Sequence, residues 1–105
     1  MQTYKVYLSD LATIDLSRIV DYITNADSQE RAKYVEQGIL EAMKKLSTFP
    51  TAHPIDGYAS TDEREIRFLM KWRYKILFFV EAETVQVVGI FHTAQSPDKL
   101  LFYRL

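Results

Sequence analysis

The segment YKILFFVE, residues 74–81, alternates its side chains as the two faces of a β-strand do. One face carries Tyr74, Ile76, Phe78 and Val80, and we expect this face to meet the helices of the domain. The other face carries Lys75, Leu77, Phe79 and Glu81. Leu77 and Phe79 therefore lie beside a cation, which predicts either an exposed surface for a partner or burial beneath the C-terminal segment DKLLFYRL.

Two further strand-like runs flank this segment, at Glu65–Met70 and Thr84–Thr93. The connections between the runs are Lys71-Trp72-Arg73 and Ala82-Glu83, which are short enough for hairpins. The three runs therefore predict an antiparallel meander with YKILFFVE in its centre. The longest irregular stretch, TAHPIDGYAS at residues 51–60, precedes the meander.

The N-terminal half predicts a strand and two helices. Residues Thr3–Leu8 read as a strand, and Ser9 or Asp10 can cap a helix that runs to about Thr24, with a break at Asn25-Ala26. Asp27 and Glu30 have the spacing of a capping box for a second helix, which we expect to end at Phe49-Pro50. The order is β-α-α-β-β-β, an α+β fold in which the N-terminal strand and a helical hairpin pack on an antiparallel sheet.

Length and composition set limits on the domain and its chemistry. A chain of 105 residues suits one hydrophobic core, so we expect a single domain over residues 1–105. The absence of cysteine excludes disulfides, thiolate metal sites and cysteine nucleophiles. No segment reads as a signal peptide or a membrane span, so we expect a cytoplasmic protein without membrane contact.

Charge is distributed unevenly along the chain. Residues 1–63 carry six Lys/Arg against ten Asp/Glu, a net charge of −4, whereas residues 64–105 carry seven against four, a net charge of +3. The cations of the second part concentrate at Arg64, Arg67, Lys71, Arg73 and Lys75. This cluster predicts a surface for a phosphate backbone or an acidic protein segment, with a solvated sheet face as the alternative.

Several motifs occur in a characteristic order along the chain. They are the strand-helix-helix opening, LSTFP at residues 46–50, an Arg-bearing strand, YKILFFV at residues 74–80 and a last strand that ends in IFH at residues 90–92. Together they resemble the RelE/ParE toxin superfamily, and the resemblance spans essentially the whole chain. It implies a growth-inhibiting toxin of a type II toxin–antitoxin system, neutralised by a cognate antitoxin, as a homodimer or a toxin–antitoxin hetero-oligomer.

The resemblance implies two possible targets. RelE-like members are ribosome-dependent mRNA endonucleases that work without metal, whereas ParE-like members inhibit DNA gyrase without catalytic chemistry. If the chain is RelE-like, the resemblance assigns Lys75 and Arg67 to the phosphate and His92 to acid–base catalysis. Many members have Arg three residues after this histidine, where this chain has Gln95. A neutral amide cannot offset phosphate charge, so we favour a ParE-like toxin that acts by binding.

The surface expected to bind the target or the antitoxin comprises Arg64, Arg67, Lys71, Arg73, Lys75, Leu77, Phe79 and Gln95. A third hypothesis is a degenerate scaffold that binds antitoxin without being toxic. Trp72 can stack on a ligand or cap the core, and Tyr103 can stack on a base or pack in the interior. His92 is either functional or the hydrogen-bonded end of a strand. With only His53 as the second histidine and no carboxylate cluster beside either, we expect no metal and no cofactor.

Overall fold

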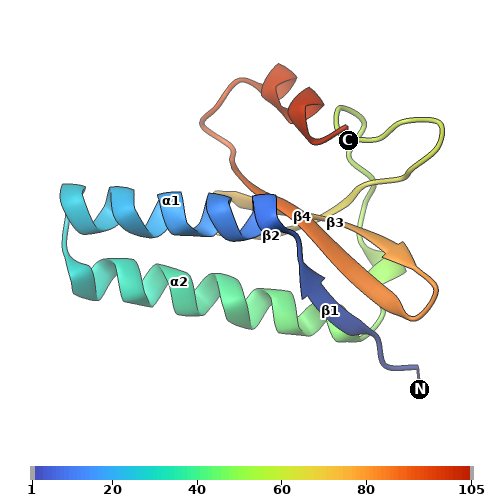
Figure 1. Cartoon of the computed structure of the whole chain (residues 1–105), viewed down its shortest axis with the longest axis horizontal. Helices are drawn as coiled ribbons and strands as arrows, with labels where there is room; N and C mark the ends of the chain where they lie inside the picture. The colour runs from blue at the N-terminus through green and yellow to red at the C-terminus, as the bar shows by residue number, and fades with distance from the viewer. Residues whose placement is uncertain (1, 105) are drawn as a thin grey trace.

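The computed structural model describes residues 2–104 (Figure 1). Its elements are β1 (Lys5–Leu8), α1 (Asp10–Ala26), α2 (Gln29–Lys44), β2 (Arg67–Lys71), β3 (Tyr74–Glu81) and β4 (Thr84–His92), with 3-10 helices at Lys45–Ser47, Pro50–Ala52 and Pro97–Tyr103. The α+β class and the order β-α-α-β-β-β are confirmed. No helix within residues 2–104 is long and apolar enough to cross a membrane.

Serine side chains cap both long helices. The Ser9 Oγ accepts a hydrogen bond of 3.0 Å from the Ala12 N–H at the start of α1, as expected. At the start of α2 the cap is Ser28, whose Oγ accepts from the Arg31 N–H at 3.0 Å, so the predicted cap at Asp27 is wrong. Asp27 instead closes α1, because its N–H bonds to the Ile23 carbonyl and the helix continues past the expected break.

The second helix also ends earlier than expected. α2 proper stops at Lys44, and one 3-10 turn at Lys45–Ser47 carries Leu46 into the core. Phe49 then adopts a left-handed backbone with φ 49°, directly before Pro50. A residue that precedes proline is disfavoured in the right-handed helical region, which explains why the helix cannot reach this point.

The sheet has the strand order β1-β4-β3-β2. Strands β2, β3 and β4 form the predicted antiparallel meander, and β1 adds to β4 in parallel, so the complete sheet is mixed rather than purely antiparallel. The β2–β3 hairpin turns through Trp72 and Arg73 alone, because Lys71 already pairs with Tyr74. Both hairpins have a positive φ at the first turn residue, 52° at Trp72 and 55° at Ala82.

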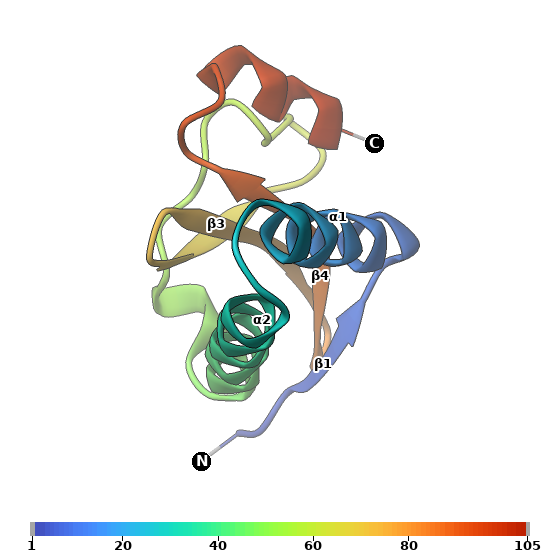
Figure 2. The same cartoon turned by 90° about the vertical axis from the view of Figure 1, so that its left-hand side faces the viewer.

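Each face of the sheet has its own hydrophobic cluster. The helical hairpin covers one face, and the loop before β2 and the C-terminal segment cover the other (Figure 2). Ile76 and Phe78 lie on the helix side, and Leu77 lies on the opposite side, fully buried with Ile66 and Leu100. The alternation of residues 74–81 is therefore confirmed. Of its two alternatives for Leu77, burial beneath the C-terminal segment is the correct one.

A β-bulge in β4 allows the helices to pack on one face of the sheet and the C-terminal segment to pack on the other. Leu77 pairs with Gly89 and Phe78 with Val87, so the register shifts by one residue there. A side chain at Gly89 would meet Tyr103, since a Cβ would lie 2.0 Å from the ring's Cε1. Only glycine therefore allows the C-terminal segment to approach the sheet this closely.

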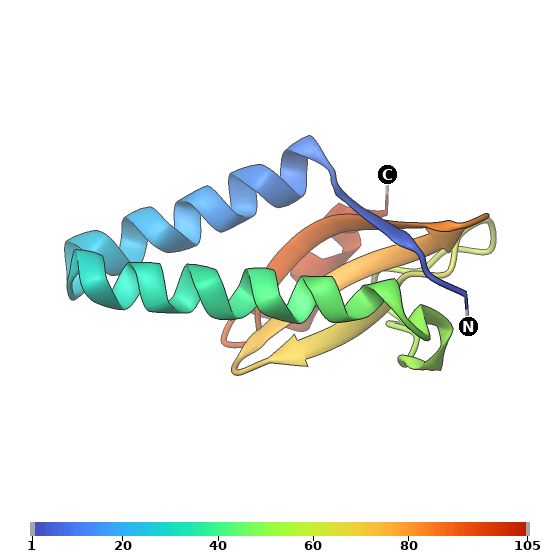
Figure 3. The same ribbon diagram turned by 90° about the horizontal axis from the view of Figure 1, so that it is seen from below.

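The helical hairpin extends beyond the ends of the strands. Figure 3 shows the α1–α2 corner projecting past the β2–β3 turn and the end of β4. The molecule measures 39 × 33 × 21 Å along its principal axes. The projecting corner and the strand ends line an open cleft that the sequence did not reveal.

Candidate functional site

The predicted cationic surface is divided between the two faces of the sheet. Arg67 pairs with Phe78, and cross-strand partners share a face, so Arg67 lies on the helix side. Lys75 contacts Phe68 on the opposite side, with its Nζ 4.5 Å from the ring centroid. The expectation of one surface with all these cations is therefore wrong. The two-residue turn is the cause, because a loop that also included Lys71 would have placed Arg67 opposite Leu77.

Lys75 forms a partly buried ion pair. Its Nζ lies 2.7 Å from Oδ2 of Asp56, which is 3% exposed. The Asp56 Oδ1 accepts two backbone hydrogen bonds, from Tyr58 at 3.0 Å and from Ala59 at 2.9 Å. This pair fixes the loop at residues 51–60 to the sheet, so the ammonium group is already neutralised by a carboxylate.

Arg67 and Arg64 are engaged with neighbouring groups. The Arg67 Nη1 donates to the His53 carbonyl at 2.7 Å, and its Nη2 lies 3.9 Å from Oε1 of Glu65. The Arg64 guanidinium lies 4.1 Å above the half-buried ring of Phe79. Burial and then the charge of Arg67 lower the pKa of His53.

His92 lies at the end of β4, opposite Tyr74 on the helix side of the sheet. The two rings meet edge to face with centroids 5.0 Å apart, and Nδ1 accepts from the Ala94 N–H at 3.0 Å. Gln95 is exposed in the following turn. Lys75 pairs with Phe91, the neighbour of His92, so the histidine and the lysine point to opposite faces. The three groups proposed for RNA cleavage are not brought together.

Tyr103 packs in the interior. The residue is 9% exposed, and its hydroxyl donates to the Asp15 Oδ2 at 2.8 Å. The same carboxylate oxygen accepts from the Ile90 N–H at 2.9 Å, so α1, β4 and the C-terminal segment are joined at one point. Burial, together with the hydrogen bond and charge of Asp15, raises the pKa of the Tyr103 hydroxyl. Of the two alternatives for Tyr103, the structure supports core packing.

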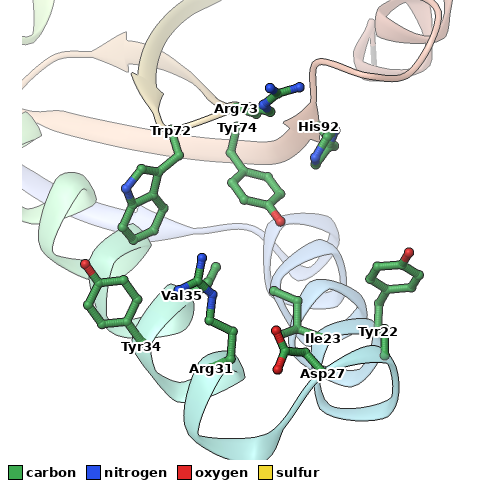
Figure 4. A pocket seen from close by; sticks show the side chains of 11 residues that line it. Tyr22, Ile23, Asp27, Arg31, Tyr34, Val35, Trp72, Arg73, Tyr74 and His92 are labelled. Carbon is green, nitrogen blue, oxygen red and sulfur yellow. The ribbon is translucent and has the colours of Figure 1, made fainter.

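The cleft between the hairpin corner and the strand ends has a volume of about 590 Å³ and is rich in aromatic and charged side chains (Figure 4). It is lined by Tyr22, Ile23, Ala26, Asp27, Arg31, Tyr34, Val35, Trp72, Arg73, Tyr74 and His92. Of these, sequence reasoning singled out Arg73 and His92 as site residues and left Trp72 between two interpretations. Tyr22 and Tyr34 were missed, although both are aromatic residues outside the apolar stripes of their helices.

Trp72 forms a wall of this cleft. Its ring lies against α2 at Gly38, where a Cβ would lie 2.2 Å from the ring's Cη2. The ring centroid is 5.6 Å from that of Tyr34, with a tilt of 32°, and the Lys71 Nζ lies 4.6 Å from the indole. Trp72 is nevertheless 45% exposed. It therefore packs on the helix through one part and presents the rest to the cleft.

No group of three or more metal-binding side chains comes together within residues 2–104. The ion pair of Lys75, the buried hydroxyl of Tyr103 and the loop contacts of Arg67 are parts of the interior or of its edges. The cleft at the strand ends is a concave surface that combines three exposed aromatic rings with guanidinium groups.

Comparison with known proteins agrees with this architecture. Residues 6–97 match the family model described as the ParE toxin of the type II toxin–antitoxin system parDE. A solved structure of the chromosomal ParDE TA system from P. aeruginosa has a chain with the same fold, at a TM-score of 0.70 and 20% identity, over 86% of this chain and 96% of that one. A comparison with curated proteins gave no match. The chain belongs to the ParE toxin family of type II toxin–antitoxin systems.

Proposed function

We propose that this toxin arrests growth by binding a macromolecular target such as DNA gyrase, without cleaving a substrate, and that a cognate antitoxin neutralises it by binding. The family match over residues 6–97 supports a type II toxin, and DNA gyrase is the target that the resemblance to ParE-like members implies. The single observation that supports binding over cleavage is the placement of Lys75 and Arg67 on opposite faces of the sheet.

Cleavage of RNA by its own 2′-hydroxyl needs a base, an acid and cations around one phosphate. Lys75 already neutralises Asp56 at 2.7 Å, and Arg67 donates to a loop carbonyl. The Gln95 amide carries no charge for the developing phosphorane. A phosphate beside His92 would therefore lack both cations that this mechanism assigns to it.

Growth and gyrase assays test the proposal. Expression of the toxin alone should stop growth, co-expression with the neighbouring antitoxin gene should restore it, and the purified toxin should inhibit supercoiling by DNA gyrase. Leu77→Asp is the control for non-specific effects, because a charge in this buried position should unfold the hydrophobic cluster beneath the C-terminal segment.

Three results would count against the proposal. Growth arrest without inhibition of supercoiling would exclude gyrase as the target. Codon-linked cuts in translated messages, detected by primer extension, would establish an endonuclease instead. Unimpaired growth with the folded toxin present would favour a scaffold that binds antitoxin but has lost toxicity.

A further inference from the structure

The cleft at the strand ends has two opposed walls. The helical hairpin supplies Tyr22, Arg31 and Tyr34, and the strand ends supply Trp72 and Arg73 (Figure 4). The exposed fractions are 74% for Tyr22, 61% for Tyr34 and 45% for Trp72. Three large aromatic side chains therefore expose ring surface to solvent around one cleft. A bound group could cover this surface.

We propose that this cleft binds a nucleotide unit, with the base against the aromatic rings and the phosphate at the guanidinium groups. Every nucleobase has a π-face that can stack on Tyr or Trp, and an arginine fork matches the geometry of a phosphate. The cleft volume of about 590 Å³ falls within the range of small-molecule sites. The unit is either a free nucleotide or part of a single strand of nucleic acid.

The charged groups of the cleft suit an anion at one end. Within the described residues neither Arg31 nor Arg73 forms an ion pair, but the Arg31 guanidinium lies over the Tyr34 ring, 5.7 Å from its centroid, and the Lys71 ammonium lies beside Trp72. Asp27 is the acidic member of the lining and lies on the hairpin side in Figure 4. Since a carboxylate repels phosphate, we place the phosphate toward Arg73 on the strand side and the base toward Tyr34 and Trp72.

A peptide fits this cleft less well than a nucleotide. A peptide that adds as a strand needs a free sheet edge, but the cleft lies at the ends of central strands β3 and β4. A peptide that docks as a helix needs a long apolar groove. The apolar aliphatic lining here is limited to Ile23, Ala26 and Val35.

Binding at this cleft does not rest on the proposed action against gyrase. The lining residues are separate from the Lys75–Asp56 pair and from the hydrophobic cluster beneath the C-terminal segment. A toxin that failed to inhibit gyrase could still bind a nucleotide here, and a gyrase inhibitor could lack this site. The binding test therefore uses the purified full chain and no target protein.

The chain contains a built-in reporter, because Trp72 is its single tryptophan. Titration with adenosine monophosphate should quench or shift the Trp72 emission, and calorimetry should show the same saturation. Adenosine, which lacks the phosphate, should bind about ten-fold or more weakly, since a charge-assisted contact is lost. A short single-stranded oligoadenylate that binds more tightly identifies a nucleic acid strand as the source, and equal affinity identifies the free nucleotide.

Matched variants locate the site. Arg73→Gln should weaken adenosine monophosphate about ten-fold, and Tyr34→Leu should weaken adenosine as well, because it removes a ring. Arg18→Gln is the control, since it removes the same charge from an exposed position of α1 outside the cleft. Absence of both quenching and heat would overturn the proposal. Equal losses in Arg18→Gln, or binding of an acidic aromatic peptide in place of nucleotides, would do so too.

Discussion

Gly38 lies in the middle of α2, where a glycine is normally unfavourable, and its replacement by alanine tests how Trp72 is held. In a helix interior Gly→Ala usually stabilises a protein by about 0.5–1 kcal/mol. Here the new Cβ would lie 2.2 Å from Cη2 of Trp72 and 2.8 Å from Cζ3. Atoms cannot approach this closely, so the indole has to leave its place on the helix.

The cost of moving the indole follows from its burial. Trp72 is 45% exposed, so about half of its surface is covered. For a side chain of roughly 250 Å², complete loss of this burial would cost about 3 kcal/mol at about 25 cal/mol per Å². Partial displacement, offset by the helix propensity of alanine, predicts a net loss of about 1–2 kcal/mol in the free energy of unfolding for Gly38→Ala.

A double-mutant cycle separates the two contributions. In a Trp72→Ala background no ring opposes the methyl group, so Gly38→Ala should stabilise by about 0.5–1 kcal/mol. Urea unfolding followed by circular dichroism measures all four proteins, and Trp72 emission should shift to the red in Gly38→Ala. If Gly38→Ala stabilises both backgrounds equally and leaves the emission unchanged, Trp72 does not pack on Gly38, and the cleft wall is placed wrongly.

Other perturbations test the interior and its titrating groups. Asp56→Asn keeps the oxygen that accepts the two backbone hydrogen bonds but leaves the Lys75 ammonium unpaired. Urea unfolding should therefore show a loss of about 2 kcal/mol in the free energy of unfolding, and adding Lys75→Met to this variant should recover part of it. Burial raises the pKa of Tyr103, so its contribution to stability should be complete below the unfolded pKa near 10 and be lost as pH rises above it. Tyr103→Phe should flatten this alkaline loss while weakening the fold at neutral pH, and an unchanged alkaline profile would contradict the assignment. The pKa of His53 is lowered, so its contribution should be present above the unfolded pKa of about 6.5 and be lost below it; His53→Gln should remove this acidic step from thermal unfolding curves.

The local sequence pattern was sufficient to predict the helices and strands, but it did not predict how all the strands pair. The alternation of residues 74–81 predicted both faces of β3, because side-chain direction follows from chain position alone. The start of α2 was displaced by one residue because Asp27 and Ser28 are both good caps, and Asp27 was needed to close α1. The parallel pairing of β1 with β4 depends on how α1 returns over the sheet, which no local pattern encodes.

The prediction of the candidate site depended on the length of the β2–β3 turn, and an error of one residue was enough to make it wrong. A three-residue turn places Arg67 on the same face as Lys75, and the observed two-residue turn places them on opposite faces. Sequence patterns locate turns only to within a residue or two, but assigning a side chain to one face of the sheet requires the turn to be known to the exact residue. The partner of Lys75 was equally hidden, because Asp56 is 19 positions away in an irregular loop.

Because β3 is buried on both faces, the centre of the sheet is not a surface on which this toxin can bind a partner. Ile76, Leu77 and Phe78 are all 0% exposed, so the centre of the sheet offers no surface, and cations near it are engaged with the interior or its loops. Exposed rings and guanidinium groups gather instead at the ends of β3 and β4. The hairpin corner extends beyond those ends (Figure 3), so residues of α1 and α2 meet the turn at Trp72 there. Arg73→Gln and Tyr34→Leu should alter ligand binding with little loss of stability, whereas changes at Asp56 or Tyr103 should do the reverse.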